Sequence, residues 1–431
     1  MMNNDALAAI LRGQGYRVWW VGASARAAVT GAVAHRQERA TDAPTEALDA
    51  ALAVVRGLDP AAGPWSVSAV PEGIDAWLRT RGFTVDAFAV DGDGERVDPL
   101  GGVAHLAAGV LRTVDSPDRA FREDPLRLLE LPRLVSETGA WPVGDVRRFA
   151  ARDAGNILDT RDRRQRWGEE LNGLLLGAHV ERALQAAWET RVIPFLMPEV
   201  AGLVGFDKSC AVHHKDIWEH TKLVTQKAEA RLVVRWAALC HDIGKVWTRS
   251  VNREGKVHFF RHEEHGALLF ESIAHRVGLD AELTERVAYV IETHSRVNLY
   301  QDDWTDSAVR RLIRETQGHL PDLIAFSKAD FTTKREATIQ RLERQMRELE
   351  ARIAQIEAED ARLPPLSKGI GDAIMSHYSL APSRTVGRLK RLLEDTIASG
   401  ELPERGQDRL YLDWLDQREE VRDWVSEARA R

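Results

Sequence analysis

Apart from one possible short hairpin, strand-forming sequence in this 431-residue chain almost stops after about residue 116. Residues 18–21 have the apolar signature of a buried strand, and further strand-like runs occur at 65–70 and 83–90. The last run is followed by a turn string rich in Gly and Asp. Beyond about residue 116, apolar residues recur at spacings of three and four, which predicts helices. We therefore expect an α+β protein, with a small α/β head followed by a long, mostly α-helical body.

The helical part contains two clear amphipathic stretches and one interruption. Residues 125–137 and 163–176 have the three- and four-residue spacing of helices. A single short hairpin is expected at 249–260, around Glu254-Gly255.

Composition excludes several classes of protein. The formal net charge is −7, so bulk charge would not hold the chain to nucleic acid, and RNA binding would need a local basic patch. Its two cysteines, Cys210 and Cys240, are far apart, which excludes a disulfide scaffold and favours a reducing cytosol. Neither a secretory signal nor a run of eighteen apolar residues is visible. We expect a cytoplasmic protein that does not enter a membrane.

The most informative motif is an adjacent His and Asp at the end of an apolar stretch. Residues 236–240 lead into His241-Asp242, which offers one neutral nitrogen and one anionic oxygen to a divalent cation. Gly244 can end the helix there, and Lys245 places a cation near the expected position of a phosphate.

Other His and Asp residues extend this motif. His220 and Asp330 could complete a coordination shell with the His241-Asp242 pair, and it is improbable that four such residues coincide by chance. His262 or His265 alone would more often be a hydrogen-bonded core residue than a ligand. These two histidines are three positions apart, which excludes the HExxH spacing of zinc proteases.

The order and local context of six residues resemble the metal-binding positions of the HD phosphohydrolase superfamily: His220, His241, Asp242, His262, His294 and Asp330. The resemblance implies a helical domain that binds one or two divalent ions (Mn, Ni, Fe, Mg or Zn) and hydrolyses phosphoesters. It implies that His262 and His294 hold the second ion and the other four residues the first. His241, Asp242 and Lys245 would be the catalytic residues, whereas His214 and His265 have no counterpart.

The rest of the chain resembles the bacterial-type (class II) tRNA nucleotidyltransferases, the CCA-adding enzyme family, many of which carry an HD domain in this position. The matching segments are residues 21–26, 98–102, 111–113, 121–127 and 366–402. The resemblance implies four parts: a nucleotidyltransferase-like head at 1–115, a helical neck that binds RNA or nucleotide at 116–205, an HD domain at 206–335 and a helical tail at 336–431.

The head departs from that family at positions that carry chemistry. Nucleotidyl transfer uses paired carboxylates that hold divalent ions, and this chain has Arg36 and Glu38 where the family has two aspartates. Ala23 replaces a phosphate-binding glycine, Ala27 replaces an aspartate, and Gly82 replaces another polar residue. These departures predict a head that has lost nucleotidyl transfer.

Some nucleotide-binding and RNA-binding positions persist. The EDxxR segment of the family, which reads the incoming base, matches residues 123–127, although these residues could merely cap a helix. Basic clusters at 161–166 and 384–391 suit phosphate contacts along an RNA stem, with a solvated helix face as the alternative. The candidates are Glu123, Asp124, Arg127, Arg163, Arg166 and Arg388.

Apolar residues at three- and four-residue spacing between 339 and 356 predict one long helix. This helix would pack on its own chain or, as the alternative, form the seam of a homodimer.

These features favour a metal-dependent HD-domain phosphohydrolase or phosphodiesterase on a tRNA-nucleotidyltransferase-like scaffold. The substrate expected first is a phosphate at the 3′ end of tRNA or another RNA. A small nucleotide is the second candidate substrate. One alternative is an active CCA-adding tRNA nucleotidyltransferase. The other is a non-catalytic tRNA-binding or regulatory protein.

Overall fold

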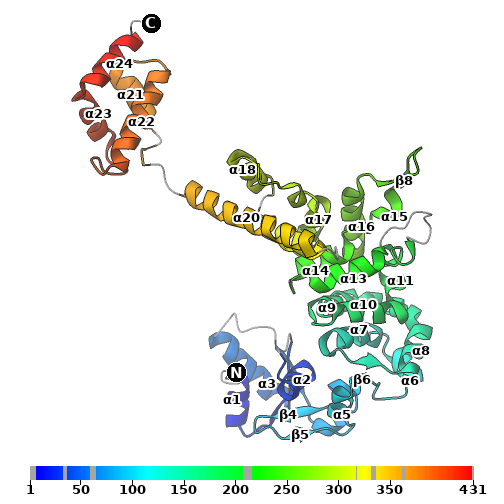
Figure 1. The fold of residues 1–431 in the computed structure, drawn as a ribbon. Coiled ribbons are helices and arrows are strands. Elements are labelled where there is room, and N and C mark those ends of the chain that lie inside the picture. Colours follow the sequence, from blue (N-terminus) through cyan, green and yellow to red (C-terminus); the bar gives the residue numbers. More distant parts are fainter. Residues whose placement is uncertain are drawn as a thin grey trace. The chain divides into compact units, whose positions relative to one another are not determined.

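The computed structural model describes residues 6–32, 36–58, 65–206, 216–316, 318–331, 336–361, 365–367 and 369–429. It divides into two units, Met1–Leu349 and Glu350–Arg431, which we describe separately (Figure 1). The α+β class is confirmed, with the small sheet in the first unit and helices in both. Cys210 and His214 lie outside the described residues.

The head is a five-stranded sheet with the order β3-β2-β1-β4-β5. Its strands are β1 (Val18–Val21), β2 (Gln37–Thr41), β3 (Trp65–Ala69), β4 (Ala89–Asp91) and β5 (Arg96–Val97). Its helices are α1 (Ala6–Gly13), α2 (Gly22–Thr30), α3 (Thr45–Leu58), α4 (Ile74–Leu78) and α5 (Gly102–Ala107). β1 is antiparallel to both of its neighbours, and β2 pairs with β3 in parallel.

The predicted strand at 83–90 is only partly correct. Strand β4 begins at Ala89, because Thr84–Asp86 forms a 3-10 turn instead. The Thr84 amide donates to the Arg112 carbonyl at 2.9 Å, and a Cβ on Gly102 would lie 2.0 Å from the Thr84 carbonyl oxygen. This close contact with α5 turns the chain before the strand can start.

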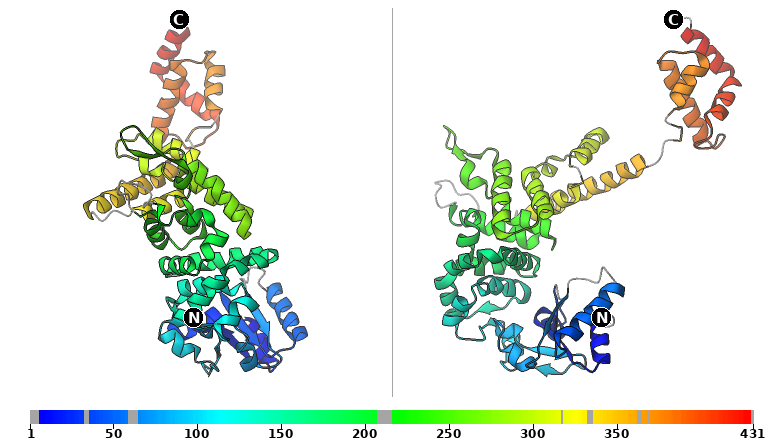
Figure 2. Two further views of the ribbon diagram at one scale, coloured as in Figure 1. Left: turned by 90° about the vertical axis from the view of Figure 1, so that its right-hand side faces the viewer. Right: turned by 180° about the vertical axis from the view of Figure 1, so that it is seen from behind.

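The neck and the HD region together form layers of helices. The neck contains α6 (Pro117–Glu123), α7 (Arg127–Thr138), α8 (Gly144–Asp153), α9 (Arg164–Leu176), α10 (Val180–Glu189), α11 (Val192–Leu196) and α12 (Pro198–Ala201). Its short strand β7 (Trp141–Pro142) pairs with β6 (Val110–Leu111), which precedes the neck. The HD region contains α13 (Ile217–Lys227), α14 (Leu232–Cys240), α15 (Lys245–Thr248), β8 (Arg249–Val251), β9 (Val257–Phe259), α16 (His262–Val277), α17 (Ala281–Thr293), α18 (Asp306–Glu315) and α19 (Leu320–Asp330). In Figures 1 and 2, α7, α9 and α10 separate the head from the HD helices.

Helix α14 forms the centre of the HD region because it is apolar on all sides. Every residue from Val233 to Cys240 is buried, and the helix packs against α9, α13, α17 and α19. Its one charged residue, Arg235, donates to the carbonyls of Ala228 and Leu175 at 2.8 Å. His241 and Asp242 follow directly after the last residue of this buried helix.

A chain of buried ion pairs joins the head to the neck. Its members alternate in charge along the order Asp86, Arg26, Glu137, Arg133, Glu170 and Arg36. Arg133 lies 2.9 Å from Glu137, and Arg36 lies 3.3 Å from Glu170, whose side chain is fully buried. Burial by itself would raise the pKa of Glu137, but Arg133 and Arg26 outweigh it and lower that pKa to about 2.

Helix α20 (Glu336–Ala361) confirms the long helix expected around 339–356. Met346 and Leu349 are buried, and the Ser327 hydroxyl contacts the Met346 sulfur at 3.9 Å, so this part of the helix packs on its own chain. A homodimer is not shown. The boundary between the two units falls within α20, and the finer division into head, neck, HD domain and tail stays a prediction.

The second unit is a bundle of four helices after α20: α21 (Ile370–Tyr378), α22 (Arg384–Ala398), α23 (Asp408–Asp416) and α24 (Glu419–Arg429). They enclose one apolar core, which includes Leu389, Leu393, Tyr411 and Leu415. No helix in the described part of the chain has the length and apolar character needed to cross a membrane.

Arg133→Met should lower the free energy of unfolding by about 3 kcal/mol, because Glu137 and Glu170 would lose their shared cation inside the protein. Urea unfolding at neutral pH measures this change. Arg79→Ala, which removes an exposed pair with Asp75, is the control and should change stability by less than about 0.5 kcal/mol. Equal effects of the two substitutions would contradict the structural importance of the buried chain of ion pairs.

Candidate functional site

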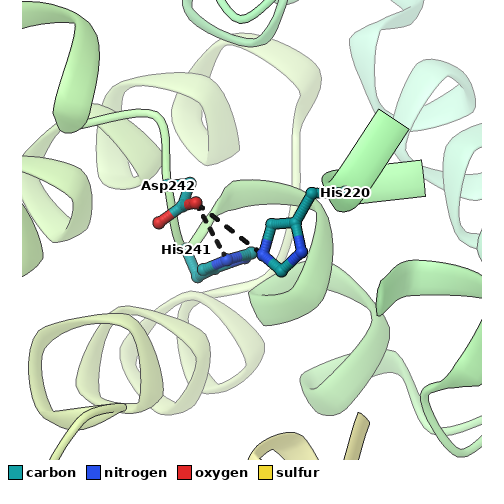
Figure 3. Close-up of side chains that lie close together, drawn as sticks. All are labelled: His220, His241 and Asp242. Carbon is teal, nitrogen blue, oxygen red and sulfur yellow. Dashed lines mark ion pairs between the residues drawn. The ribbon is translucent and has the colours of Figure 1, made fainter. Parts of the chain in front are cut away.

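The HD region brings the six predicted metal-site residues to one place. Two groups of three side chains have ligand atoms within 4.8 Å of one another, and both groups include Asp242. The first group is His220, His241 and Asp242 (Figure 3), and the second is Asp242, His262 and His294. The His220 Nε2 atom lies 3.2 Å from Asp330 Oδ1, which joins Asp330 to the first group.

Three of these histidines are oriented by the backbone. The Nδ1 atom of His241 lies 3.0 Å from the Ala238 carbonyl, that of His262 lies 3.0 Å from the Phe259 carbonyl, and that of His294 lies 2.7 Å from the Ile291 carbonyl. Since a carbonyl only accepts, each Nδ1 carries a proton and donates it to the backbone, which leaves Nε2 as the ring atom available to the centre. Imidazoles oriented in this way beside a carboxylate are a donor set that fits a divalent metal.

Two glycines allow α16 to reach the end of α14. A Cβ on Gly244 would lie 2.1 Å from the His262 carbonyl oxygen, and a Cβ on Gly266 would lie 3.2 Å from Ile291. Gly244 has ordinary right-handed helical angles. Its role is therefore close packing, which holds His262 beside Asp242, rather than the helix-breaking role expected from the sequence.

The charges of the centre also suit a cation. Burial would raise the pKa of Asp242, but His241 and Lys245 outweigh it and hold that pKa well below its usual value. Burial, followed by the nearby His241, lowers the pKa of His294 to about 4. The Lys245 Nζ atom lies 2.7 Å from Asp242 Oδ1, so Lys245 binds this carboxylate. At neutral pH the centre thus combines an anionic Asp242 with a neutral His294.

In the head, the surviving carboxylate Glu38 lies against the turn between β1 and α2. The Ala23 amide donates to Glu38 Oε2 at 3.1 Å, and the Ser24 hydroxyl accepts from the Glu38 amide at 2.8 Å. Gly22 has φ +52°, and a Cβ there would lie 1.6 Å from Glu38 Oε2. A glycine is required at this position both by its backbone angle and by the carboxylate beside it.

The Arg36 side chain binds helix α9 of the neck. Its guanidinium donates to the Glu169 carbonyl at 2.8 Å and pairs with Glu170 on α9. The sequence position of Arg36 suggested a cation within the site, but the side chain is directed toward the neck. Gly82, which replaces a polar residue of the family, also faces the neck. A Cβ there would lie 2.8 Å from Glu130 Oε2 and 3.3 Å from Arg127, so side chains of the neck occupy the space that a larger residue at position 82 would need.

The candidate nucleotide-binding residues lie at the start of α7 and α9. Asp124 Oδ1 accepts from the Leu126 amide at 3.3 Å and lies 3.8 Å from Arg163. Arg127 donates to the Ala120 carbonyl at 3.2 Å, and the exposed Glu123 pairs with Arg119. These contacts include interactions that cap or brace a helix, which was the alternative to base recognition for residues 123–127. They also leave Asp124 and Arg163 side by side.

The remaining basic candidates, Arg166 and Arg388, have partners of their own. Arg166 pairs with Glu169 at 2.7 Å. Arg388 belongs to the second unit, where its guanidinium lies 3.6 Å from the centre of the Trp424 ring.

Comparison with known proteins identifies both parts of the chain. The HD domain family model matches residues 210–356. An A-adding tRNA nucleotidyltransferase from Deinococcus radiodurans is 29% identical over 84% of this chain and 86% of that protein. A CC-adding tRNA nucleotidyltransferase from Thermus thermophilus is 30% identical over 67% of this chain and 66% of that protein. The chain is a homologue of the bacterial-type tRNA nucleotidyltransferases.

A solved structure has the same fold as this chain over nearly its whole length. The Bacillus stearothermophilus CCA-adding enzyme in complex with CTP has a TM-score of 0.55 and 20% identity, and covers 97% of both chains. This likeness concerns the fold alone.

These relatives overturn the expected function. The sequence favoured an HD phosphohydrolase whose head had lost nucleotidyl transfer, whereas the relatives over most of the chain are named nucleotidyltransferases. The prediction relied on Arg36 as a cation that would repel metal, and the structure shows that guanidinium bound to α9. The hydrolase and pseudoenzyme interpretations are therefore wrong.

Gly244→Ala should lower the free energy of unfolding by about 1–3 kcal/mol, because the added methyl group would collide with the His262 backbone. Thermal or urea unfolding measures the loss. Gly387→Ala in α22 is a matched control, since a Cβ there meets nothing within 4 Å, and should be neutral or stabilising. A neutral Gly244→Ala variant would contradict the packing role.

Proposed function

We propose that this protein transfers nucleotides onto the 3′ end of tRNA. The observation that supports this most strongly is the 29% identity to an A-adding tRNA nucleotidyltransferase over 84% of the chain. The CC-adding relative extends the same reaction class to a second protein, although the two names differ in the nucleotide added. Cytidine and adenosine triphosphates are both candidate substrates.

Glu38 is the head residue on which the proposed transfer depends. It occupies one of the two carboxylate positions of the family, and its Oε2 lies at the start of α2, beside the Ala23 amide. Two other carboxylates of the head, Asp42 and Asp86, pair with Arg17 and Arg26 respectively. Among the head residues that the structure describes, no three His, Cys, Asp or Glu side chains converge on a point. These residues do not fit a pair of protein-held metal ions, and we assign no step to such a pair.

The residues at the neck supply binding in this proposal. Asp124 and Arg127 would contact the incoming base, since they lie next to the head at the start of α7. Glu123, Arg163 and Arg166 would contribute to the same surface, with the arginines contacting phosphates. Arg388, in the second unit, would contact phosphates along the tRNA.

We also propose that the HD centre binds a divalent metal ion. His220, His241, Asp242 and Asp330 would hold the first ion, and His262 and His294 would hold a second that shares Asp242. The nitrogen-rich donor set favours Mn²⁺, Fe²⁺, Ni²⁺ or Zn²⁺ over Mg²⁺. A bound ion would supply a positive charge able to attract phosphate oxygens. His241 and Asp242 are ligands in this proposal, and Lys245 holds Asp242 in place.

The wild-type protein should extend tRNA that lacks its terminal nucleotides when labelled CTP or ATP is supplied with a divalent salt. Glu38→Ala should abolish this incorporation, because it removes the one carboxylate retained at the two family positions. Glu46→Ala, an exposed glutamate on α3, is the control and should retain it. Absence of incorporation by the wild type with either nucleotide would refute the proposed function.

Asp242→Asn should reduce bound metal to a trace while the protein stays folded, because the shared anionic ligand of both groups is lost. Metal content by mass spectrometry and far-UV circular dichroism measure the two properties. Asp280→Asn is a matched control, since Asp280 caps α17 and Asn also caps helices. Full metal content in Asp242→Asn would contradict this ligand set.

A further inference from the structure

Exposed aromatic side chains gather at the base of the β8–β9 hairpin. Trp247 precedes β8 with 70% of its surface exposed, and Phe260 follows β9 with 69% exposed. The pairing of Arg249 with Phe259 brings these flanking residues to the same end of the hairpin. The His258 ring stacks on Phe260, with ring centres 5.0 Å apart and planes 8° from parallel. Large exposed rings of this kind mark a surface that binds a partner.

The same segment is basic within an acidic protein. Residues 245–261 contain five Lys or Arg residues and one Glu, whereas the whole chain has a formal net charge of −7. Arg253 and Lys256 are exposed at the tip of the hairpin, where Asn252 and Gly255 form the turn. Arg261 is exposed at its base, next to Phe260, and pairs with Glu264. A partner with negative charge and planar rings would complement this surface.

The hairpin is also connected directly to the HD centre. The Phe259 carbonyl accepts from His262 Nδ1 at 3.0 Å, so strand β9 helps to orient a candidate metal ligand. Lys245, which binds Asp242, lies 5.7 Å from the centre of the Phe259 ring. The aromatic and basic surface therefore borders the metal-suited site.

We infer that the β8–β9 hairpin and its flanking residues Trp247 and Phe260 bind single-stranded RNA beside the HD centre. Bases stack on exposed rings while basic side chains follow the phosphates, which is how sequence-tolerant single-strand binding works. Duplex bases are already stacked on one another, so a double strand would gain little from the rings. The inference rests on the proposed function, because the tRNA that receives the nucleotide would provide the single-stranded RNA bound by the hairpin.

The test measures the affinity of the full chain for a short fluorescein-labelled single-stranded RNA by fluorescence anisotropy. Trp247→Ala combined with Phe260→Ala should weaken binding at least about fivefold, the lower end expected for one lost base stack. Arg253→Ala combined with Lys256→Ala should lower the slope of log K against log salt by about 1.4, because two phosphate contacts are lost. Binding of a duplex of the same sequence should change little with the ring substitutions.

Matched controls separate this surface from a general effect of substitution. Val54→Ala with Leu299→Ala removes exposed apolar side chains elsewhere, and Arg79→Ala with Arg347→Ala removes exposed arginines elsewhere. Both control pairs should bind the single strand like the wild type. Hairpin variants that bind within twofold of the wild type would overturn the inference, as would an equal loss in the controls. A change of oligomeric state without loss of RNA affinity would instead make the hairpin an interface between copies and also overturn it.

The affinity test is independent of nucleotide incorporation. Incorporation by the wild type together with unchanged RNA affinity in the hairpin variants would refute the hairpin site alone. Hairpin-dependent RNA binding without any incorporation would refute nucleotidyl transfer and leave the RNA site standing.

Discussion

The buried chain of ion pairs between head and neck is the constraint on which the first part of the structure depends. Isolated charges are costly to bury, so each guanidinium there must lie between carboxylates. Arg133 satisfies Glu137 and Glu170 on the neck, while Arg26 and Arg36 extend the chain of pairs into the head. Gly173 leaves the space this requires, since a Cβ there would lie 2.8 Å from Arg133. The pairs therefore hold α7 and α9 against α2.

The HD centre depends on local backbone rules more than on long-range pairing. In His241, His262 and His294, the ring is held by the carbonyl three residues earlier, so each orientation is set within its own turn of chain. Long-range assembly then needs only close approach of the helices, which Gly244 and Gly266 allow. The resemblance to the HD superfamily, which rests on residue order and local context, named all six residues that the structure brings together.

The head was harder to predict for reasons that particular residues make clear. β1 is apolar, β3 alternates apolar residues with serine, and both were predicted. β2 has the polar sequence Gln37–Thr41 and gave no signal of a strand. The turn at Thr84–Asp86 arises from contact with Gly102, which no local pattern contains. Arg36 was misinterpreted because a sequence gives the position of a residue along a strand but not the direction of a long side chain. Its true partner, Glu170, is 134 residues away.

The HD centre and the region around Glu38 in the head offer different ligand atoms to a metal ion. The two sites are therefore expected to prefer different ions. The HD centre presents oriented imidazoles around Asp242, a donor set suited to transition metals. In the described part of the head, no three metal-ligating side chains converge, so an oxygen-preferring ion there would take most of its ligands from elsewhere, as a triphosphate can provide. A chelator selective for transition metals should therefore empty the HD centre while leaving the head unaffected. Occupancy of the proposed HD metal site and nucleotide addition at the head would then respond differently to the chelator, since different atoms would hold the ions.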